Sequence, residues 1–273
     1  MTTAIHLKTP PEDVRRALHE RGFAVVNGLI PNDALDALAE VFRLHEETSV
    51  AMSTDILFTH APPPAPRPDG IEGGMQRLMY QWLNPHRRPP PLTTRAVASA
   101  LLPAASAWLG EPAVLFQDAL MEKGASHRRF PWHQDFPFWP VDLPIGLVLW
   151  APLDPVDEAS GGLSLAERSH LAGVGPAIDL HTGAAQPGGS GPMLDESAYE
   201  VTCPELAPGD AILFHPLLWH TSSTNRAGRR RRVWASTWLG ASARFSHARA
   251  PRHPLCRILD DGSPVSSLRG GLL

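Results

Sequence analysis

The sequence predicts a mainly β protein with flanking α-helices, in which N-terminal helices pack on an antiparallel β-sandwich or jelly roll. Up to Leu109 the apolar residues recur with helical spacing, whereas from Ala113 onward they form short runs separated by Gly, Pro and Asp. The chain has 273 residues, 43% of them hydrophobic, and no internal repeat. We therefore expect one domain spanning residues 1–273, with a full core.

Helices are predicted over residues 11–21, 31–46 and 94–109, where apolar side chains recur every three or four positions. The first of these ends at Gly22, a residue typical of helix C-termini. The helices within residues 11–46 are expected to pack on the sheets.

Strands are predicted where runs rich in Val, Ile, Leu and Trp have strand length. These runs are residues 23–26, 113–121, 145–152, 162–165, 211–214 and 233–239. Two segments dense in Gly and Pro, about 61–74 and 182–194, are predicted to be surface loops that act as lids.

Charge and composition exclude several classes of protein. The net charge of −4 offers no broad positive field to a phosphate backbone, so no nucleic-acid partner is expected. No apolar stretch approaches the roughly 20 residues that cross a bilayer, and the N-terminus lacks a signal-like region, so we expect a cytoplasmic protein without a membrane partner. Two isolated cysteines exclude a Cys-type zinc cluster. The expected partner is a small-molecule substrate, and the expected assembly is a monomer or homodimer.

The most informative motif is Trp132-His133-Gln134-Asp135. Residues two apart in an extended segment point to one face, so His133 and Asp135 can bind one metal ion while Gln134 points away. A third ligand is expected at a later strand end, and His220 fits that position. Two imidazoles and one carboxylate leave adjacent coordination sites free, the arrangement used at Fe(II) to activate O2.

A lone His-x-Asp pair also occurs by chance, so its interpretation depends on accompanying residues. Arg231 follows His220 by eleven positions and can hold a dicarboxylate by paired hydrogen bonds. The alternative, a solvated basic turn, fits the rest of the run over residues 229–232. If Arg231 begins a strand, it shares a face with Val233, Ala235 and Thr237, whereas Arg230 and Arg232 share the other face with Trp234 and Trp238.

From about Gly22 to about Trp238, the chain resembles the phytanoyl-CoA dioxygenase family. The matching features, in family order, are Gly22 to Val26, Lys123-Gly124, Trp132 to Asp135, Trp150 to Asp154, Gly161 to Leu163, Ser169-His170, Pro208 to Asp210, His220 to Ser222, Asn225-Arg226 and Arg231. One departure is Glu167-Arg168, where the family has Pro-Gly, so the turn there is expected to differ.

The resemblance implies a double-stranded β-helix, a cupin-like jelly roll, with His133, Asp135 and His220 binding Fe(II). It also implies that Arg231 with Ser222 holds the distal carboxylate of 2-oxoglutarate, and that Lys123 and Trp150 contact this co-substrate. A solvated surface position for Lys123 stays equally open. The implied reaction uses O2, releases succinate and CO2, and is stimulated by ascorbate. Because halogenating relatives replace the carboxylate ligand by a small residue, Asp135 favours hydroxylation or a related oxidation.

The substrate is the least determined part of the interpretation. Gln117, Met121, Phe138 and Trp139 flank the first two ligands and are candidates to line the pocket, although each also suits the core. Their mainly apolar character favours a substrate with substantial hydrocarbon. His127 and His215 are interpreted as a loop histidine and a packing histidine rather than as ligands.

Two other classes of function stay open at this point. A non-catalytic cupin-like binding or sensor protein would hold a structural metal on the same fold. A zinc hydrolase could use two histidines and one aspartate, but it would give Arg231 and Ser222 no role.

Overall fold

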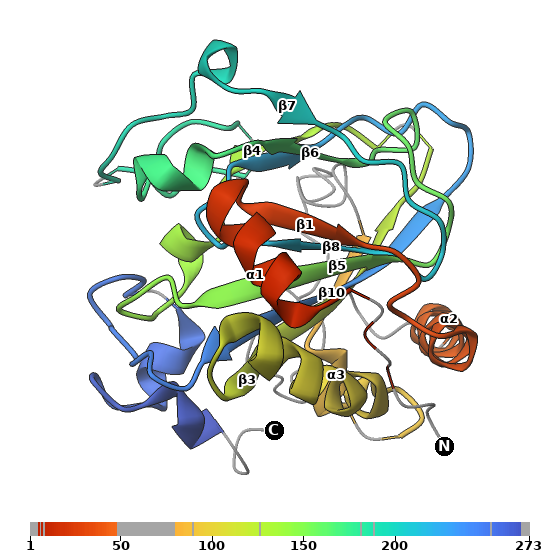
Figure 1. Cartoon of the computed structure of the whole chain (residues 1–273), viewed down its shortest axis with the longest axis horizontal. Coiled ribbons are helices and arrows are strands. Elements are labelled where there is room, and N and C mark those ends of the chain that lie inside the picture. Colours follow the sequence, from red (N-terminus) through yellow and green to blue (C-terminus); the bar gives the residue numbers. More distant parts are fainter. Residues whose placement is uncertain are drawn as a thin grey trace, which may run out of the picture.

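The computed structural model describes residues 5, 7, 9–47, 80–88, 90–125, 127–180, 182–187, 189–251 and 253–268. The expected lid at 61–74 lies outside these residues. Two antiparallel sheets form the body of the molecule (Figure 1). The six-stranded sheet has the order β1 (Phe23–Val26), β8 (Ala211–Phe214), β5 (Gly146–Pro152), β10 (Arg231–Gly240), β3 (Ala113–Lys123) and β2 (Tyr80–Leu83). The four-stranded sheet has the order β4 (Phe130–His133), β9 (His220–Ser222), β6 (Leu163–Ala166) and β7 (Val201–Thr202).

This arrangement confirms the predicted jelly roll, because strands far apart in the chain become neighbours in each sheet. The predicted strands match β1, β3, β5, β6, β8 and β10 within about two residues at each end. No strand was predicted over β2 or β7, and β4 and β9 were expected only as an extended segment and a strand end around the histidines. All four are at most four residues long.

Three helices cover the face of the six-stranded sheet that points away from the second sheet (Figure 1). They are α1 (Pro11–Glu20), α2 (Asn32–Glu47) and α3 (Arg95–Leu109), close to the predicted ranges. Their apolar faces and the sheet together form an outer cluster, which includes Val14, Leu38, Leu101, Trp108, Leu120, Trp234 and Trp238. None of the helices in the described ranges is long and apolar enough to span a membrane.

Gly22 makes the connection from α1 to β1. Its backbone adopts φ 88°, and a Cβ atom there would lie 2.5 Å from Leu218 Cδ1. The position therefore requires glycine for both conformation and space.

An inner cluster of apolar side chains fills the space between the two sheets. It includes Phe116, Phe136, Trp139, Val148, Trp150, Leu163, Phe214 and Val233. Because neighbouring residues of a strand face opposite sides, β10 contributes Val233 to the inner cluster and Trp234 to the outer cluster. This confirms the alternation predicted for β10 and points Arg231 toward the second sheet.

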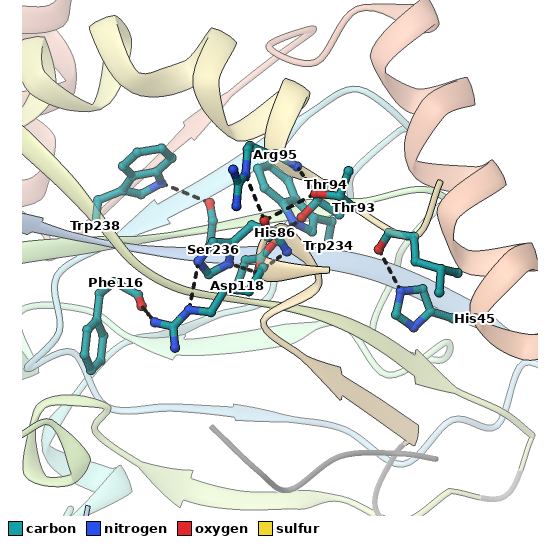
Figure 2. Close-up of polar contacts among 12 residues, drawn as sticks. His45, His86, Thr93, Thr94, Arg95, Phe116, Asp118, Trp234, Ser236 and Trp238 are labelled. Atoms are coloured by element: carbon teal, nitrogen blue, oxygen red, sulfur yellow. Dashed lines mark hydrogen bonds and ion pairs between the residues drawn. The ribbon is translucent and has the colours of Figure 1, made fainter. Parts of the chain in front are cut away.

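A buried polar network lies on the helix-covered side of the six-stranded sheet (Figure 2). The Asp118 carboxylate accepts hydrogen bonds from His86 Nδ1 at 2.5 Å, from Trp234 Nε1 at 3.0 Å and from the Thr94 hydroxyl. These bonds tie the short 3-10 helix η2 (Pro85–Arg87) and the start of α3 to β3 and β10. The network therefore fixes the connection between β2 and α3.

Candidate functional site

The three predicted metal ligands come together at one end of the four-stranded sheet. His133 Nε2 lies 3.6 Å from Asp135 Oδ1, and His220 Nε2 lies 3.7 Å from the same oxygen. All three ligand atoms lie within 4.8 Å of one another. Among the described residues this is the one group of three or more His, Cys, Asp or Glu side chains able to hold a metal ion.

Hydrogen bonds select the tautomer that leaves each Nε2 free for a metal. His133 Nδ1 lies 2.9 Å from the Pro131 carbonyl oxygen, and His220 Nδ1 lies 2.9 Å from the Leu218 carbonyl oxygen. Since a carbonyl oxygen only accepts, each Nδ1 carries the proton. Burial lowers the pKa of His133 to about 3 and that of His220 to about 4, so both imidazoles stay neutral and able to bind a metal near pH 7.

The strand register and one loop carbonyl set the positions of these ligands. His133 and His220 are opposite each other in the β4–β9 pair. The backbone N–H groups of Asp135 and Phe136 both donate to the Pro216 carbonyl oxygen at 3.1 Å, which fixes the turn after β4.

Gln134 points away from the site, as predicted. Its Nε2 donates to the carbonyl oxygens of Leu217 at 2.7 Å and Gly173 at 3.0 Å, and its Oε1 accepts from the Gly175 N–H at 2.7 Å. Gln134 therefore links the loop segments at residues 173–175 and at Leu217 to the strand that carries His133.

The donor set fits a divalent transition metal. Two neutral imidazoles and one carboxylate on one side of an ion leave the opposite coordination positions open, as in the facial triad of non-haem iron sites. Burial raises the pKa of the Asp135 carboxyl, and a bound cation would oppose this effect by stabilising the carboxylate.

Arg231 is separated from the rest of its basic run by burial. It is 1% exposed, whereas the side chain of Arg230 is 49% exposed and pairs with Glu46, and Arg232 pairs with Asp154. The Arg231 guanidinium lies 5.2 Å from the centre of the Trp150 ring. Its Nε and Nη2 are buried and have no hydrogen-bond partner in the part of the chain that the structure describes. Because unpaired buried donors are costly, these two groups indicate an anionic ligand at this position.

Lys123 is also buried, directly opposite Arg231 in the β3–β10 register. Its Nζ lies 2.9 Å from Ser222 Oγ, 3.1 Å from the Ser222 carbonyl oxygen and 2.6 Å from the Ser223 carbonyl oxygen. Burial lowers the pKa of Lys123 to about 6, and the nearby Arg231 charge contributes to this shift. The solvated surface position that the sequence left open is therefore wrong.

The four candidate substrate residues lie between the sheets. Gln117 and Met121 are half-buried on β3, and Phe138 is half-buried in the 3-10 helix η3 (Phe136–Phe138). Trp139 is 3% exposed and packs on the rings of Phe116 and Phe136 in the inner cluster. The three partly exposed side chains stay candidates for substrate contact, while Trp139 packs in the core.

Gln81 on β2 was not among the predicted site residues. It is opposite Met121 in the β2–β3 register and is half-buried. The four-residue strand that carries it has no clear alternation in the sequence, so the position could not be found without the pairing.

The other histidines and the altered turn have structural roles. His215 Nδ1 accepts from the Leu217 N–H at 3.1 Å, and the half-buried His127 Nδ1 accepts from the Gly124 N–H at 2.8 Å. Arg168 adopts φ 64°, the conformation that glycine favours. Glu167 beside it forms a salt bridge with Arg21 at 2.8 Å. The turn therefore keeps a glycine-like backbone conformation without glycine.

The described part of the predicted lid over 182–194 begins close to the candidate site. Leu180, two residues before it, packs against Phe130, as Met121 does. A Cβ atom at Gly183 would lie 3.3 Å from Pro131 Cβ, next to the strand that carries His133.

Comparisons with known proteins agree with this geometry. The chain is 26% identical over 191 residues to L-proline trans-4-hydroxylase of Streptomyces griseoviridis. This match covers 61% of this chain and 68% of that protein. The non-haem, α-ketoglutarate-dependent carbocyclase SnoK of nogalamycin biosynthesis has a similar structure, with a TM-score of 0.70, 14% identity and 97% of each chain covered.

A second similar structure is the epimerase SnoN in complex with Fe3+, α-ketoglutarate and nogalamycin RO. It has a TM-score of 0.69 and 18% identity, and the match covers 93% of this chain and 95% of that chain. The family model described as phytanoyl-CoA dioxygenase (PhyH) matches residues 18–233. The protein therefore belongs to the phytanoyl-CoA dioxygenase family.

Proposed function

We propose that this dioxygenase depends on Fe(II) and 2-oxoglutarate and hydroxylates, or otherwise oxidises, an unactivated C–H bond of a small, partly apolar metabolite. The observation that carries the proposal is the pairing of the His133–Asp135–His220 triad with the buried, unpaired guanidinium of Arg231. A metal site alone would not require a buried cation with two free donors.

His133, Asp135 and His220 would bind the iron, and Arg231, whose guanidinium lies over the Trp150 ring, would hold the distal carboxylate of 2-oxoglutarate together with Ser222. The SnoN structure contains both Fe3+ and α-ketoglutarate, which supports this pair of groups. When bound, they supply the oxidation of the substrate by O2 coupled to decarboxylation of 2-oxoglutarate to succinate and CO2, with ascorbate as a stimulant.

The protein's own residues contribute position and a dry environment. The carbonyl oxygens of Pro131 and Leu218 hold both imidazoles in one orientation. The inner cluster around Phe214 and Trp150 excludes water from the buried side of the site. The carboxylate at Asp135 occupies the position that halogenating relatives leave small, which favours an oxidation that transfers oxygen or removes hydrogen.

The inner face of the six-stranded sheet supports a substrate that is uncharged where it meets the site. By strand alternation, the charged residues facing the second sheet from β3, β5, β8 and β10 are Lys123 and Arg231. Both are assigned to the co-substrate region. The remaining polar groups there, such as Gln117 and Thr237, can form hydrogen bonds but carry no charge. A free amino acid, with two charged groups, finds no matching pair on these strands.

The experiment that tests the proposal is an anaerobically prepared, Fe(II)-loaded enzyme screened against candidate metabolites, with succinate release and product mass measured together. A gain of one oxygen atom, or a loss of two hydrogens, matched to succinate would support it. Turnover with zinc and without 2-oxoglutarate would instead identify a hydrolase. Iron and 2-oxoglutarate binding without turnover of any substrate would favour a sensor protein.

A further inference from the structure

Lys123 and Arg231 present two basic side chains side by side at the end of the β3–β10 pair. Lys123 is 0% exposed and Arg231 is 1% exposed. Neither forms a salt bridge with a carboxylate among the described residues. The proximity of a second buried positive charge contributes to the lowered pKa of Lys123, and a bound anion would stabilise the charged forms of both groups, so this end of the site is built for an anion.

The two basic side chains differ in how their donors are used. When protonated, the Lys123 amino group has three N–H groups, and three oxygen acceptors lie within 3.1 Å of it, all on Ser222 and Ser223. Arg231 has two buried donor nitrogens, Nε and Nη2, without partners among the described residues. The free donors therefore belong to Arg231, while those of Lys123 are directed at the end of the strand that carries His220.

The slot that holds Lys123 is closely fitted. At Gly161, whose φ is 86°, a Cβ atom would lie 2.8 Å from Lys123 Cδ and 2.9 Å from the Ser223 carbonyl oxygen. The Asn225 amide donates to the Lys123 carbonyl oxygen at 2.7 Å and to the Arg229 carbonyl oxygen at 2.8 Å. The backbone of Lys123 is therefore fixed by Asn225, and its side chain is fixed beside Gly161 with Nζ directed at Ser222.

We infer that Lys123 is a positioning residue that acts on the co-substrate through the Ser222 hydroxyl rather than by direct contact. The Ser222 Oγ accepts from the ammonium at 2.9 Å, so the hydroxyl hydrogen stays available to a second acceptor. Beside Arg231, that acceptor is the distal carboxylate of 2-oxoglutarate. This inference rests on the proposed function, and it assigns direct contact with that carboxylate to Arg231 and Ser222.

The test is a double-mutant cycle on ligand affinity, measured by anaerobic titration calorimetry of the Fe(II)-loaded protein. The variants are Lys123→Met, Ser222→Ala and the double variant. The ligands are 2-oxoglutarate and 2-oxopentanoate, which shares the metal-binding 2-oxo acid group but lacks the distal carboxylate. Wild-type binding of 2-oxoglutarate tests the proposed function, and the cycle tests the role of Lys123.

If Lys123 acts through Ser222, Lys123→Met should weaken the binding of 2-oxoglutarate about tenfold in the wild-type background. In the Ser222→Ala background, the same substitution should weaken it less than about twofold. The affinity for 2-oxopentanoate should be unchanged in every variant. Lys123→Gln, whose uncharged amide can still donate to Ser222, should keep the affinity for 2-oxoglutarate within about threefold of wild type. It also serves as the test variant if Lys123→Met does not fold.

Two results would overturn the inference. An equal loss of affinity in both backgrounds, with Lys123→Gln as weak as Lys123→Met, would show direct contact between the ammonium and the carboxylate. A loss for both ligands would show a general structural role. If wild type binds 2-oxopentanoate and 2-oxoglutarate equally, the distal carboxylate has no site, and both the proposed function and the inference are wrong.

Discussion

His133 and His220 are direct cross-strand partners, and each imidazole bonds through Nδ1 to the carbonyl oxygen two residues earlier in the chain. The two acceptors, on Pro131 and Leu218, lie at the same distance of 2.9 Å. The same local hydrogen bond therefore orients both nitrogen ligands, although their strands are far apart in sequence.

Replacing either histidine by alanine should abolish activity and weaken Fe(II) binding by about 100-fold or more, beyond the 10- to 100-fold typical of losing an outer partner. The fold should persist, because the inner cluster does not depend on the imidazoles. Iron content after anaerobic dialysis and the thermal unfolding curve measure the two effects. His215→Ala is the matched control and should retain iron, and a His133→Ala variant with full activity would contradict the assignment.

Asp135→Gly should abolish oxidation of the substrate, because one ligand of the metal is lost. The variant keeps both imidazoles, so it should retain weak iron binding that chloride or bromide can strengthen by occupying the open position. Product analysis with and without halide checks this. A wild-type rate in Asp135→Gly would show that the carboxylate is not a ligand.

Arg231→Ala should raise the apparent KM for 2-oxoglutarate by roughly 10- to 100-fold, because charge-assisted hydrogen bonds to a buried carboxylate are worth about 1.5–3 kcal/mol. Arg230→Ala removes the same charge from a half-exposed side chain paired with Glu46, and it should change this KM little. Both constants are measured under identical iron and ascorbate conditions. Equal effects would mean that the run acts as a diffuse basic patch.

The segment 182–194 should become more protected from hydrogen exchange when 2-oxoglutarate and substrate bind, because it starts beside the strand of His133. Exchange measured by mass spectrometry on peptides from this segment checks the expectation. Peptides from α2, which packs in the outer cluster on the far side of the six-stranded sheet, provide the reference. Unchanged protection with saturating ligands would reject the lid role.

Asp118→Asn should destabilise the protein by about 3–5 kcal/mol, because it removes the charge from a buried pair with His86. Burial alone would raise the pKa of Asp118, but the charge of His86 and the hydrogen bonds from His86, Thr94 and Trp234 outweigh it and hold the pKa below its ordinary value. The folded protein therefore binds this proton less readily than the unfolded chain. The stabilisation is present above about pH 4 and is lost as the pH falls through the folded-state pKa.

Denaturant unfolding of wild type and Asp118→Asn between pH 7 and pH 3 measures this contribution. The difference in unfolding free energy should be largest near pH 7 and should shrink toward pH 3. Thr94→Val, which removes one hydrogen bond and no charge, should cost about 1–3 kcal/mol with little pH dependence. A constant difference across the pH range would contradict the charged state of Asp118.

The parts of the site that rest on local spacing could be predicted from the sequence. His133 and Asp135 follow the two-residue period of extended chain, and Arg231 follows the alternation of a long strand, so both orientations were predictable. A fully extended chain would place His215 on the strand face opposite to His220, but the chain turns after β8 with a Leu218 N–H to His215 carbonyl bond of 2.8 Å. Strand parity therefore does not apply to it.

The parts that depend on distant pairing could not be predicted. Asp118 and His86 are 32 residues apart, and nothing in the sequence identifies one as the partner of the other. Gln81 reaches the inner face because a four-residue edge strand pairs with β3. The three acceptors around the Lys123 ammonium are set by the meeting of both sheets, about 100 residues apart in the chain.

The metal ligands and Arg231 belong to different layers of the sandwich, and this division has a mechanical consequence. A molecule held by Arg231 at one end and by the metal at the other joins the helix-backed sheet to the four-stranded one. Lys123 already makes a permanent link of this kind to Ser222. Occupancy of the site should therefore resist separation of the two layers, so that a filled pocket stiffens the whole sandwich.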